Sequence, residues 1–455
     1  MTLWTAAEIA QATGGSMSGD FTVNGVAFDS REVGAGDLFV AMAGEATDGH
    51  RFVPQALAAG AGGAIVSAPC DGPHVRVADG FAALQALGTA ARKRSAARIV
   101  GVTGSVGKTS AKEALHAALE RSNHGRVHRS VKSYNNHTGV PLSLARMPRD
   151  AAFGVFEMGM NHAGELAALT RMVRPHVAIV TAIAPAHLEF FADEAAIADA
   201  KAEIFQGLEP GGVAIVPWDS PHRDRLIAAA RPHADRIVTF GLEKGADVHA
   251  REVMRLGQGG TFVTATLGGG RELSFTVAQP GLHWVSNALA VLAAVDALGA
   301  DLGQAGLALA ELGGLAGRGK RTVVSAGDGD ALLIDESYNA NSASMRAGLA
   351  VLAEEPGRHL AVLGEMRELG DRSAALHADL ADAVVAARVE TALLVGEAMA
   401  PLARALEGRI NLVHVADAET ALASLRDLLA PGDAVLVKGS NGVGLSRIVA
   451  ALGGG

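Results

Sequence analysis

Cysteine is almost absent from this sequence of 455 residues, since Cys70 is the only one. A single cysteine excludes both a disulfide framework within the chain and a zinc site built from several cysteines. Aromatic residues are also scarce, at 4%. Hydrophobic residues nevertheless make up 49% of the chain. The sequence therefore predicts several buried cores made of Ala, Val, Leu and Ile, in about three domains of roughly 150 residues each.

The chain has no basic surplus, because 39 Lys and Arg residues face 48 Asp and Glu residues and give a net charge of −9. This balance argues against nucleic acid as a main partner, although local cationic sites for small anions stay possible. No basic residue precedes Arg31, so the charged start of a secretory signal is missing. No uncharged apolar run is long enough to span a bilayer, and the run that most resembles a span, from Asn287, is interrupted by Asp296 and Asp301. We expect a cytoplasmic protein with no membrane span.

Three stretches of the chain differ in pattern, and we interpret them as domains 1–80, 81–312 and 313–455. The first contains short apolar runs at 23–28, 38–41 and 64–67, separated by polar turns. This pattern predicts a small α/β unit with ligand-binding residues between its strands.

The second stretch alternates apolar runs with helical patterns, which predicts a doubly wound parallel sheet. Its expected strands are 98–103, 155–158, 177–183 and 213–216, with helices at 81–94 and 285–298 and antiparallel hairpin strands at 261–266 and 273–277. The third stretch repeats the rhythm, which predicts a Rossmann-like open sheet. Its expected strands are 331–335, 360–363, 392–395, 412–415 and 434–437. The glycine-rich run 313–319 is the expected hinge between the second and third domains.

The segment 101–110, Gly-Val-Thr-Gly-Ser-Val-Gly-Lys-Thr-Ser, follows an apolar strand and precedes a helical pattern. Glycines at such a turn let backbone N–H groups surround phosphate oxygens, and the helix start adds partial positive charge. Lys108 would reach the β- and γ-phosphates, and Thr109 would offer its hydroxyl to Mg²⁺. The general motif has Gly at position 102, where this chain has Val, but the shorter Thr-Gly-x-x-Gly-Lys-Thr form is intact.

Polar residues that follow the next strands form a second group of candidates. Glu157 ends a predicted strand, where a carboxylate beside a phosphate loop suits Mg²⁺, although a solvated or capping role is the alternative. His187 lies at the same sheet edge, but imidazole is not the ligand that Mg²⁺ prefers, so a plain loop histidine is equally compatible. Lys201 lies on a helical pattern where lysine usually faces solvent. A free ammonium would repel a cation, so Lys201 could serve a metal only after conversion to an anion.

Together these segments resemble the Mur ligases, the ATP-dependent amide-forming family of peptidoglycan precursor synthesis. Segments 28–31 (Phe-Asp-Ser-Arg) and 36–41 (Gly-Asp-Leu-Phe-Val-Ala) resemble the uridine-nucleotide-binding domain. Segments 134–142, 335–341 and 363–370 are similar to the member that adds D-alanyl-D-alanine to UDP-N-acetylmuramoyl-tripeptide. The Asp-Asn-Pro-Arg signature of a diaminopimelate-adding member is absent.

The resemblance implies a three-domain α/β fold: a uridine-nucleotide-binding domain, a central P-loop ATPase domain with an antiparallel appendage, and a C-terminal Rossmann-like domain that closes over ATP. It implies ATP and two Mg²⁺ ions, the two substrates named above, and a monomer. The implied ATP-binding residues are Thr103, Gly104, Ser105, Val106, Gly107, Lys108, Thr109, Ser110, His283, Asn287, Arg318 and Asp335.

The resemblance also implies the remaining site residues. The uridine substrate would be bound by Ser30, Arg31, Gly44, Asp48, His50, Asn135 and Asn136. The amine substrate would meet Tyr338, Asn339, Asn341, Lys438 and Ser440. The metals would be held by Thr109, Glu157, His187 and a Lys201 carbamylated by CO₂, and the catalytic set would be Lys108, Lys201, His187 and Glu157.

Three positions depart from the family pattern: Val106 replaces a polar residue, Trp284 replaces Asn, and Asn441 stands where Arg is usual after Lys-Gly-Ser. The last departure predicts that another cation recognises the dipeptide carboxylate.

The resemblance implies a ligase that adds D-alanyl-D-alanine to the UDP-linked tripeptide. The alternatives to this function are the tripeptide-forming Mur ligase, a folylpolyglutamate-type synthetase, a P-loop switch or kinase, and a nucleotide-binding protein without catalysis.

Overall fold

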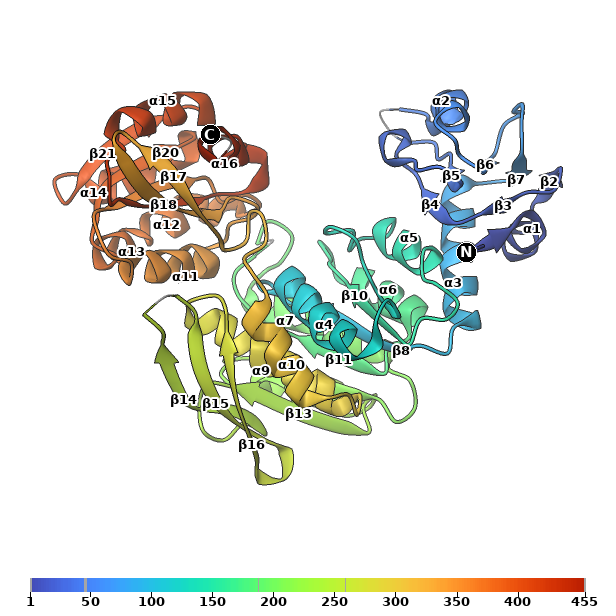
Figure 1. Ribbon diagram of the computed structural model, residues 1–455, viewed down its shortest axis with the longest axis horizontal. Helices are drawn as coiled ribbons and strands as arrows, with labels where there is room; N and C mark the ends of the chain where they lie inside the picture. Colours follow the sequence, from blue (N-terminus) through green and yellow to red (C-terminus); the bar gives the residue numbers. More distant parts are fainter. Residues whose placement is uncertain (1, 45–46, 187, 258, 454–455) are drawn as a thin grey trace.

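The computed structural model describes residues 2–44, 47–186, 188–257 and 259–453. Three units, each a β-sheet with the helices packed on it, follow one another along the chain and form an arc (Figure 1). We call them the N-terminal, central and C-terminal layers, and the central layer lies between the other two. This arrangement confirms the predicted α/β class. Among the described residues, no helix has the length and apolar content needed to cross a bilayer.

The N-terminal layer is built on a five-stranded sheet in which four strands are parallel and β2 pairs antiparallel at one edge. In spatial order its strands are β2 (Ser16–Ser18), β7 (His74–Arg76), β6 (Gly63–Val66), β5 (Asp37–Val40) and β4 (Gly25–Ala27). A two-stranded ribbon, β1 (Trp4–Thr5) with β3 (Thr22–Val23), lies beside it, and α1 (Ala6–Thr13) and α2 (Val53–Ala58) cover it. Helix α3 (Gly80–Arg94) buries Leu84 and Leu87 in the same core.

The central layer contains a nine-stranded sheet that is parallel through seven strands and ends in an antiparallel hairpin. The spatial order is β9 (Val127–Arg129), β10 (Phe153–Glu157), β8 (Arg98–Thr103), β11 (Val177–Val180), β12 (Val213–Pro217), β13 (Arg236–Gly241), β14 (Val248–Arg255), β15 (Thr261–Leu267) and β16 (Arg271–Val277). The parallel sheet and the hairpin agree with the sequence pattern. Strands β9, β13 and β14 were not predicted.

Both faces of this sheet are covered by helices, because its central strands are apolar on both sides. In β8, for example, Ile99 packs into one core cluster while Val100 and Val102 pack into another. One face carries α4 (Lys108–Asn123), α9 (Leu282–Ala297) and α10 (Leu302–Glu311). The other carries α5 (Gly139–Ala145), α6 (Glu165–Val173), α7 (Glu194–Ala202) and α8 (Arg223–Ala230). This two-sided burial is typical of a doubly wound fold.

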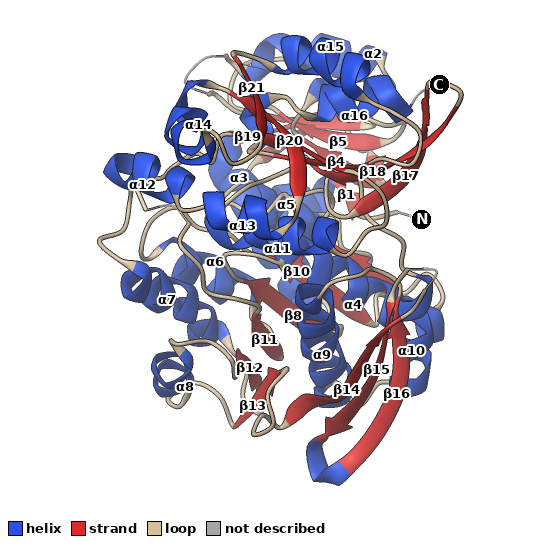
Figure 2. Ribbon diagram, turned by 90° about the vertical axis from the view of Figure 1, so that its left-hand side faces the viewer, coloured by secondary structure: helices blue, strands red, loops and turns tan. Residues whose placement is uncertain are grey.

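The C-terminal layer is a six-stranded sheet between two groups of helices (Figure 2). Its order is β17 (Lys320–Ala326), β18 (Gly329–Glu336), β22 (Ala434–Lys438), β19 (His359–Gly364), β20 (Val389–Val395) and β21 (Asn411–Val415). The helices are α11 (Ser342–Ala353), α12 (Ser373–Ala378), α13 (Ala381–Ala386) and α14 (Ala400–Leu406) on one face, and α15 (Ala418–Leu428) and α16 (Ser446–Gly453) on the other. The five predicted strands are present, and β17 is an additional antiparallel edge strand.

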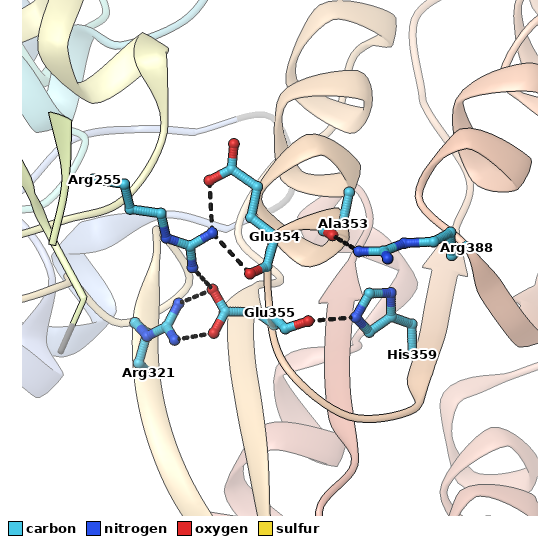
Figure 3. Close-up of polar contacts among 7 residues, drawn as sticks. All are labelled: Arg255, Arg321, Ala353, Glu354, Glu355, His359 and Arg388. Carbon is cyan, nitrogen blue, oxygen red and sulfur yellow. Dashed lines mark hydrogen bonds and ion pairs between the residues drawn. The ribbon is translucent and has the colours of Figure 1, made fainter. Parts of the chain in front are cut away.

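A cluster of charges joins the hairpin of the nine-stranded sheet to the end of α11 (Figure 3). Arg255 on β14 donates to both the carbonyl and the carboxylate of Glu354, at 2.8 and 2.7 Å, and to Glu355 at 2.7 Å. Arg321 on β17 binds the same Glu355 through both carboxylate oxygens. The Glu355 side chain is only 3% exposed, so two guanidinium groups compensate one buried carboxylate.

We predict that Arg255→Ala loosens this contact without unfolding either sheet, because Arg321 still compensates Glu355. The amides of residues 353–355 should exchange hydrogen faster, and the contact should weaken by about 1 kcal/mol. Hydrogen exchange measured by mass spectrometry checks this. The matched control is Arg251→Ala, since Arg251 pairs with Glu272 inside the hairpin. Equal exchange at 353–355 in the two variants would contradict the prediction.

Candidate active site

The loop between β8 and α4 has the backbone geometry of a phosphate-binding turn. Gly104 and Gly107 both have positive φ, at 150° and 89°. A Cβ atom on Gly104 would lie 2.0 Å from Thr181 Oγ1, and one on Gly107 would lie 2.6 Å from Asn287 Oδ1. Glycine is therefore required at both positions. Helix α4 begins at Lys108 without a side-chain cap, which leaves its first N–H groups available to an anion.

Lys108 lies folded across this loop. Its Nζ donates to the Gly104 carbonyl at 2.8 Å. Desolvation lowers the pKa of Lys108, Glu157 opposes the shift, and the charge of Arg318 adds to it. A phosphate group in the loop would restore the charged form by supplying the missing anion.

Glu157, at the end of β10, is a buried carboxylate with several partners. The Thr109 hydroxyl donates to its Oε2 at 2.8 Å, and the Asn135 side-chain amide donates to its Oε1 at 2.7 Å. Lys112 Nζ lies 3.9 Å from Oε2. The pairing of β10 with β8 brings Glu157 beside the phosphate loop. The hydroxyl and carboxylate oxygens are a donor set that suits Mg²⁺.

Lys201, near the end of α7, is 1% exposed, so the solvated position that its spacing favours is not what the structure shows. Among the described residues, no hydrogen bond or ion pair reaches its ammonium group. Burial, followed by the charge of Lys108, lowers the pKa of Lys201 well below its usual value. The side chain lines the same cavity as Lys108 and Glu157.

The C-terminal sheet contributes the opposite side of the site. Arg318 stacks on the ring of Tyr338, with 4.3 Å between the guanidinium carbon and the ring centroid. Lys438 is buried and donates to Glu336 Oε2 at 3.3 Å and to the Asn339 carbonyl at 3.1 Å. Burial lowers the pKa of Lys438, and Glu336 opposes that shift.

These two sides enclose a cavity of about 450 Å³. Sixteen of the residues proposed from the sequence line it: Ser105, Val106, Gly107, Lys108, Thr109, Ser110, Asn135, Glu157, Lys201, His283, Asn287, Arg318, Tyr338, Asn339, Asn341 and Lys438. Sequence reasoning did not select Thr181 and Glu336, which also line it. Glu336 ends β18, which is the signal that selected Glu157. Thr181 directly follows β11, but the sequence predicted a strand through residue 183, so the strand end was placed too late to mark it.

Other proposed residues lie outside the lining of this cavity: Thr103, Gly104, Asp335, Asn136 and Ser440. The Asp335 carboxylate accepts from the backbone N–H of Gly317 at 2.6 Å and from Ser337, so it holds the turn that carries Arg318. The Asn136 side chain accepts from Thr138 and from the residue that begins α5. His187 falls outside the described residues.

The residues proposed for the uridine substrate cluster on loops of the N-terminal sheet, apart from Asn135 and Asn136. Arg31 pairs with Asp29 at 2.6 Å, and this contact lowers the pKa of Asp29 to about 2. His50 contacts Asp48 through Nδ1 at 2.6 Å and accepts from the Ser67 N–H through Nε2. Ser30 begins a short 3₁₀ turn, and Gly44 donates to a nearby backbone carbonyl. None of these five residues lines the cavity described above.

Comparisons with known proteins cover most of the chain. Residues 22–122 match the Mur ligase family catalytic domain, 102–295 the Mur ligase middle domain, and 320–441 the Mur ligase glutamate ligase domain. The chain is 36% identical to a UDP-N-acetylmuramoyl-tripeptide–D-alanyl-D-alanine ligase of Synechocystis sp., over 96% of this chain and 93% of the relative.

Solved structures agree with the sequence match. A crystal structure of MurF from Acinetobacter baumannii is similar over 99% of both chains, with a TM-score of 0.86 and 33% identity. A MurF ligase from Thermotoga maritima in complex with ADP is similar over 95% of this chain and 97% of that one, with a TM-score of 0.78 and 25% identity. Sequence identity and fold thus agree over nearly the entire length, and the chain belongs to the Mur ligase family.

Proposed function

We propose that this chain joins D-alanyl-D-alanine to UDP-N-acetylmuramoyl-tripeptide and converts ATP to ADP and phosphate. The observation that carries the proposal is one cavity lined by the phosphate loop and Glu157 on one side and by Lys438 and Asn339 on the other. Full-length similarity to ligases of that name supports the choice of substrates.

The reaction needs activation, because a carboxylate does not react with an amine at useful rates. The peptide carboxylate attacks the γ-phosphorus of ATP, ADP leaves, and an acyl phosphate forms. The N–H groups of the loop at 104–108, with Lys108 and Arg318, would neutralise charge that develops during this transfer. Thr109 and Glu157, together with phosphate oxygens, would hold a Mg²⁺ ion, which when bound supplies further charge neutralisation.

The second step is attack of the dipeptide amine on the acyl phosphate, which expels phosphate. An α-amino group has a pKa of about 7.7–8.0 and is partly unprotonated at neutral pH, so we infer that no dedicated strong base is required. An acyl phosphate hydrolyses readily, and therefore the two sides of the cavity should close before it forms.

Lys201 is proposed to react with CO₂. Its lowered pKa leaves a fraction of the amine neutral and nucleophilic. The ammonium first loses one proton, and the neutral amine nitrogen then forms a bond to the carbon of CO₂ and loses a second proton, which leaves a carbamate anion in place of the buried cation. That anion suits a second Mg²⁺ site, with His187 as the further ligand proposed from the sequence.

We predict that phosphate release requires all three substrates. ATP with UDP-N-acetylmuramoyl-tripeptide alone should give no more than a single turnover, whereas addition of D-alanyl-D-alanine should give continuous release. A coupled phosphate assay with each substrate omitted in turn makes the measurement. Full release without the dipeptide would reject the ligase assignment and favour an NTPase.

We also predict that Lys201→Ala lowers kcat by about 100-fold or more, because it removes charge from the reaction site. A small carboxylic acid added to the assay should restore part of the activity by replacing the carbamate. The control is Asp199→Asn on the same helix, since the Asp199 side chain is exposed and pairs with Arg225. Activity of Lys201→Ala equal to the wild type would reject the carbamate role.

A further inference from the structure

Two loops of the C-terminal sheet run side by side where the neighbouring parallel strands β19 and β22 end. The Ser440 N–H donates to the Glu365 carbonyl at 3.0 Å, and the Arg367 backbone N–H donates to Ser440 Oγ at 3.1 Å. A Cβ atom on Gly439 would lie 3.0 Å from the Cα of Gly364. The carboxyl ends of parallel strands are where open α/β sheets bind ligands.

The Arg367 guanidinium lies over the second of these loops. Its Nη2 donates to the Gly442 carbonyl at 2.9 Å, and a Cβ atom on Gly442 would come within 2.1 Å of Nη1. Among the described residues, no carboxylate pairs with Arg367, and the residue is exposed. A backbone carbonyl therefore fixes the position of this guanidinium while its charge remains available.

The other cations on this side of the cavity are already engaged. Lys438 is buried and bound to Glu336. Arg318 is stacked on Tyr338, and its charge acts on Lys108 in the phosphate loop. Position 441, next to Ser440, carries a neutral asparagine.

We propose that Arg367 binds the C-terminal carboxylate of the incoming dipeptide and determines the enzyme's specificity for a free acid at that end. The inference rests on the function proposed above. Lys438 lines the cavity, and the loop that follows it holds Arg367 at two points. Ser440 Oγ accepts from the backbone N–H of Arg367, and the Gly442 carbonyl accepts from its guanidinium. The dipeptide would place its amine in the cavity, and the planar guanidinium beside the lining would take its carboxylate through two parallel hydrogen bonds.

The test compares D-alanyl-D-alanine with D-alanyl-D-alaninamide, which lacks the negative charge. The wild type should prefer the acid by about 10- to 100-fold in kcat/KM. Arg367→Met should remove this preference by raising KM for the acid, with unchanged kcat/KM for the amide and unchanged KM for ATP. Arg367→Lys should retain an intermediate preference. The control is Arg447→Met, an exposed arginine at the start of α16.

The outcomes separate the two proposals. If Arg367→Met keeps the wild-type preference and melts at the wild-type temperature, the role of Arg367 is overturned. If the wild type uses the acid and the amide equally well, the inference fails while the ligase function stands. If the wild type releases phosphate continuously with neither dipeptide present, the proposed function itself fails.

Discussion

The hydrogen bond between the Thr109 hydroxyl and the Glu157 carboxylate is the contact on which the active site depends. Glu157 is 1% exposed, and a buried carboxylate is costly unless it is paired and hydrogen-bonded. Its partners come from α4 (Thr109 and Lys112) and from the loop before α5 (Asn135). Because one carboxylate requires all of them, the phosphate loop and the candidate metal position form a single unit. Removing Glu157 would delete the candidate metal ligand. It would also leave the buried Lys112 with one carboxylate fewer beside it.

The same unit extends to the N-terminal sheet through one short segment. Lys132 and Tyr134 both donate to the Glu32 carboxylate on a loop of that sheet, while Asn135 donates to Glu157. Four residues of chain therefore connect the layer proposed to bind the uridine substrate with the carboxylate beside the phosphate loop. A substrate that spans these two points would be held at one end by the N-terminal loops and would present its other end to ATP. This geometry suits a long nucleotide-linked peptide better than a small alcohol.

Most strands that the sequence predicted are continuous apolar runs that the structure buries on both faces, as in β8, β11 and β19. Five of the six strands in the C-terminal sheet are apolar runs. Strand β17 begins with Lys320-Arg321-Thr322 and is half-exposed at the edge of the sheet, so its sequence lacks the apolar run that predicts a strand. Strand β9 has only three residues, and two of them, His128 and Arg129, are polar. In the site, the Gly-Lys-Thr motif located the phosphate loop. The burial of Lys201 was not predictable, because helical spacing reports one helix alone, whereas α7 is covered by distant segments of the chain.

Trp284, which stands where the family pattern has Asn, contacts the linker to the C-terminal sheet. The first two turns of α9 place His283 and Asn287 in the cavity lining, and Trp284, 7% exposed, packs against Gly319 of the linker to the C-terminal sheet. Gly319 has φ of 81°, and a Cβ atom there would lie 3.1 Å from the indole. Any rotation of the C-terminal sheet about this linker must therefore move against the segment proposed to contact adenine. The Arg255 contact to α11 also joins the two sheets, as do the hydrogen bond from Arg372 to the Ala192 carbonyl and the backbone hydrogen bond from Glu189 to Glu368. The C-terminal sheet is therefore held against the nine-stranded sheet at several points besides the linker.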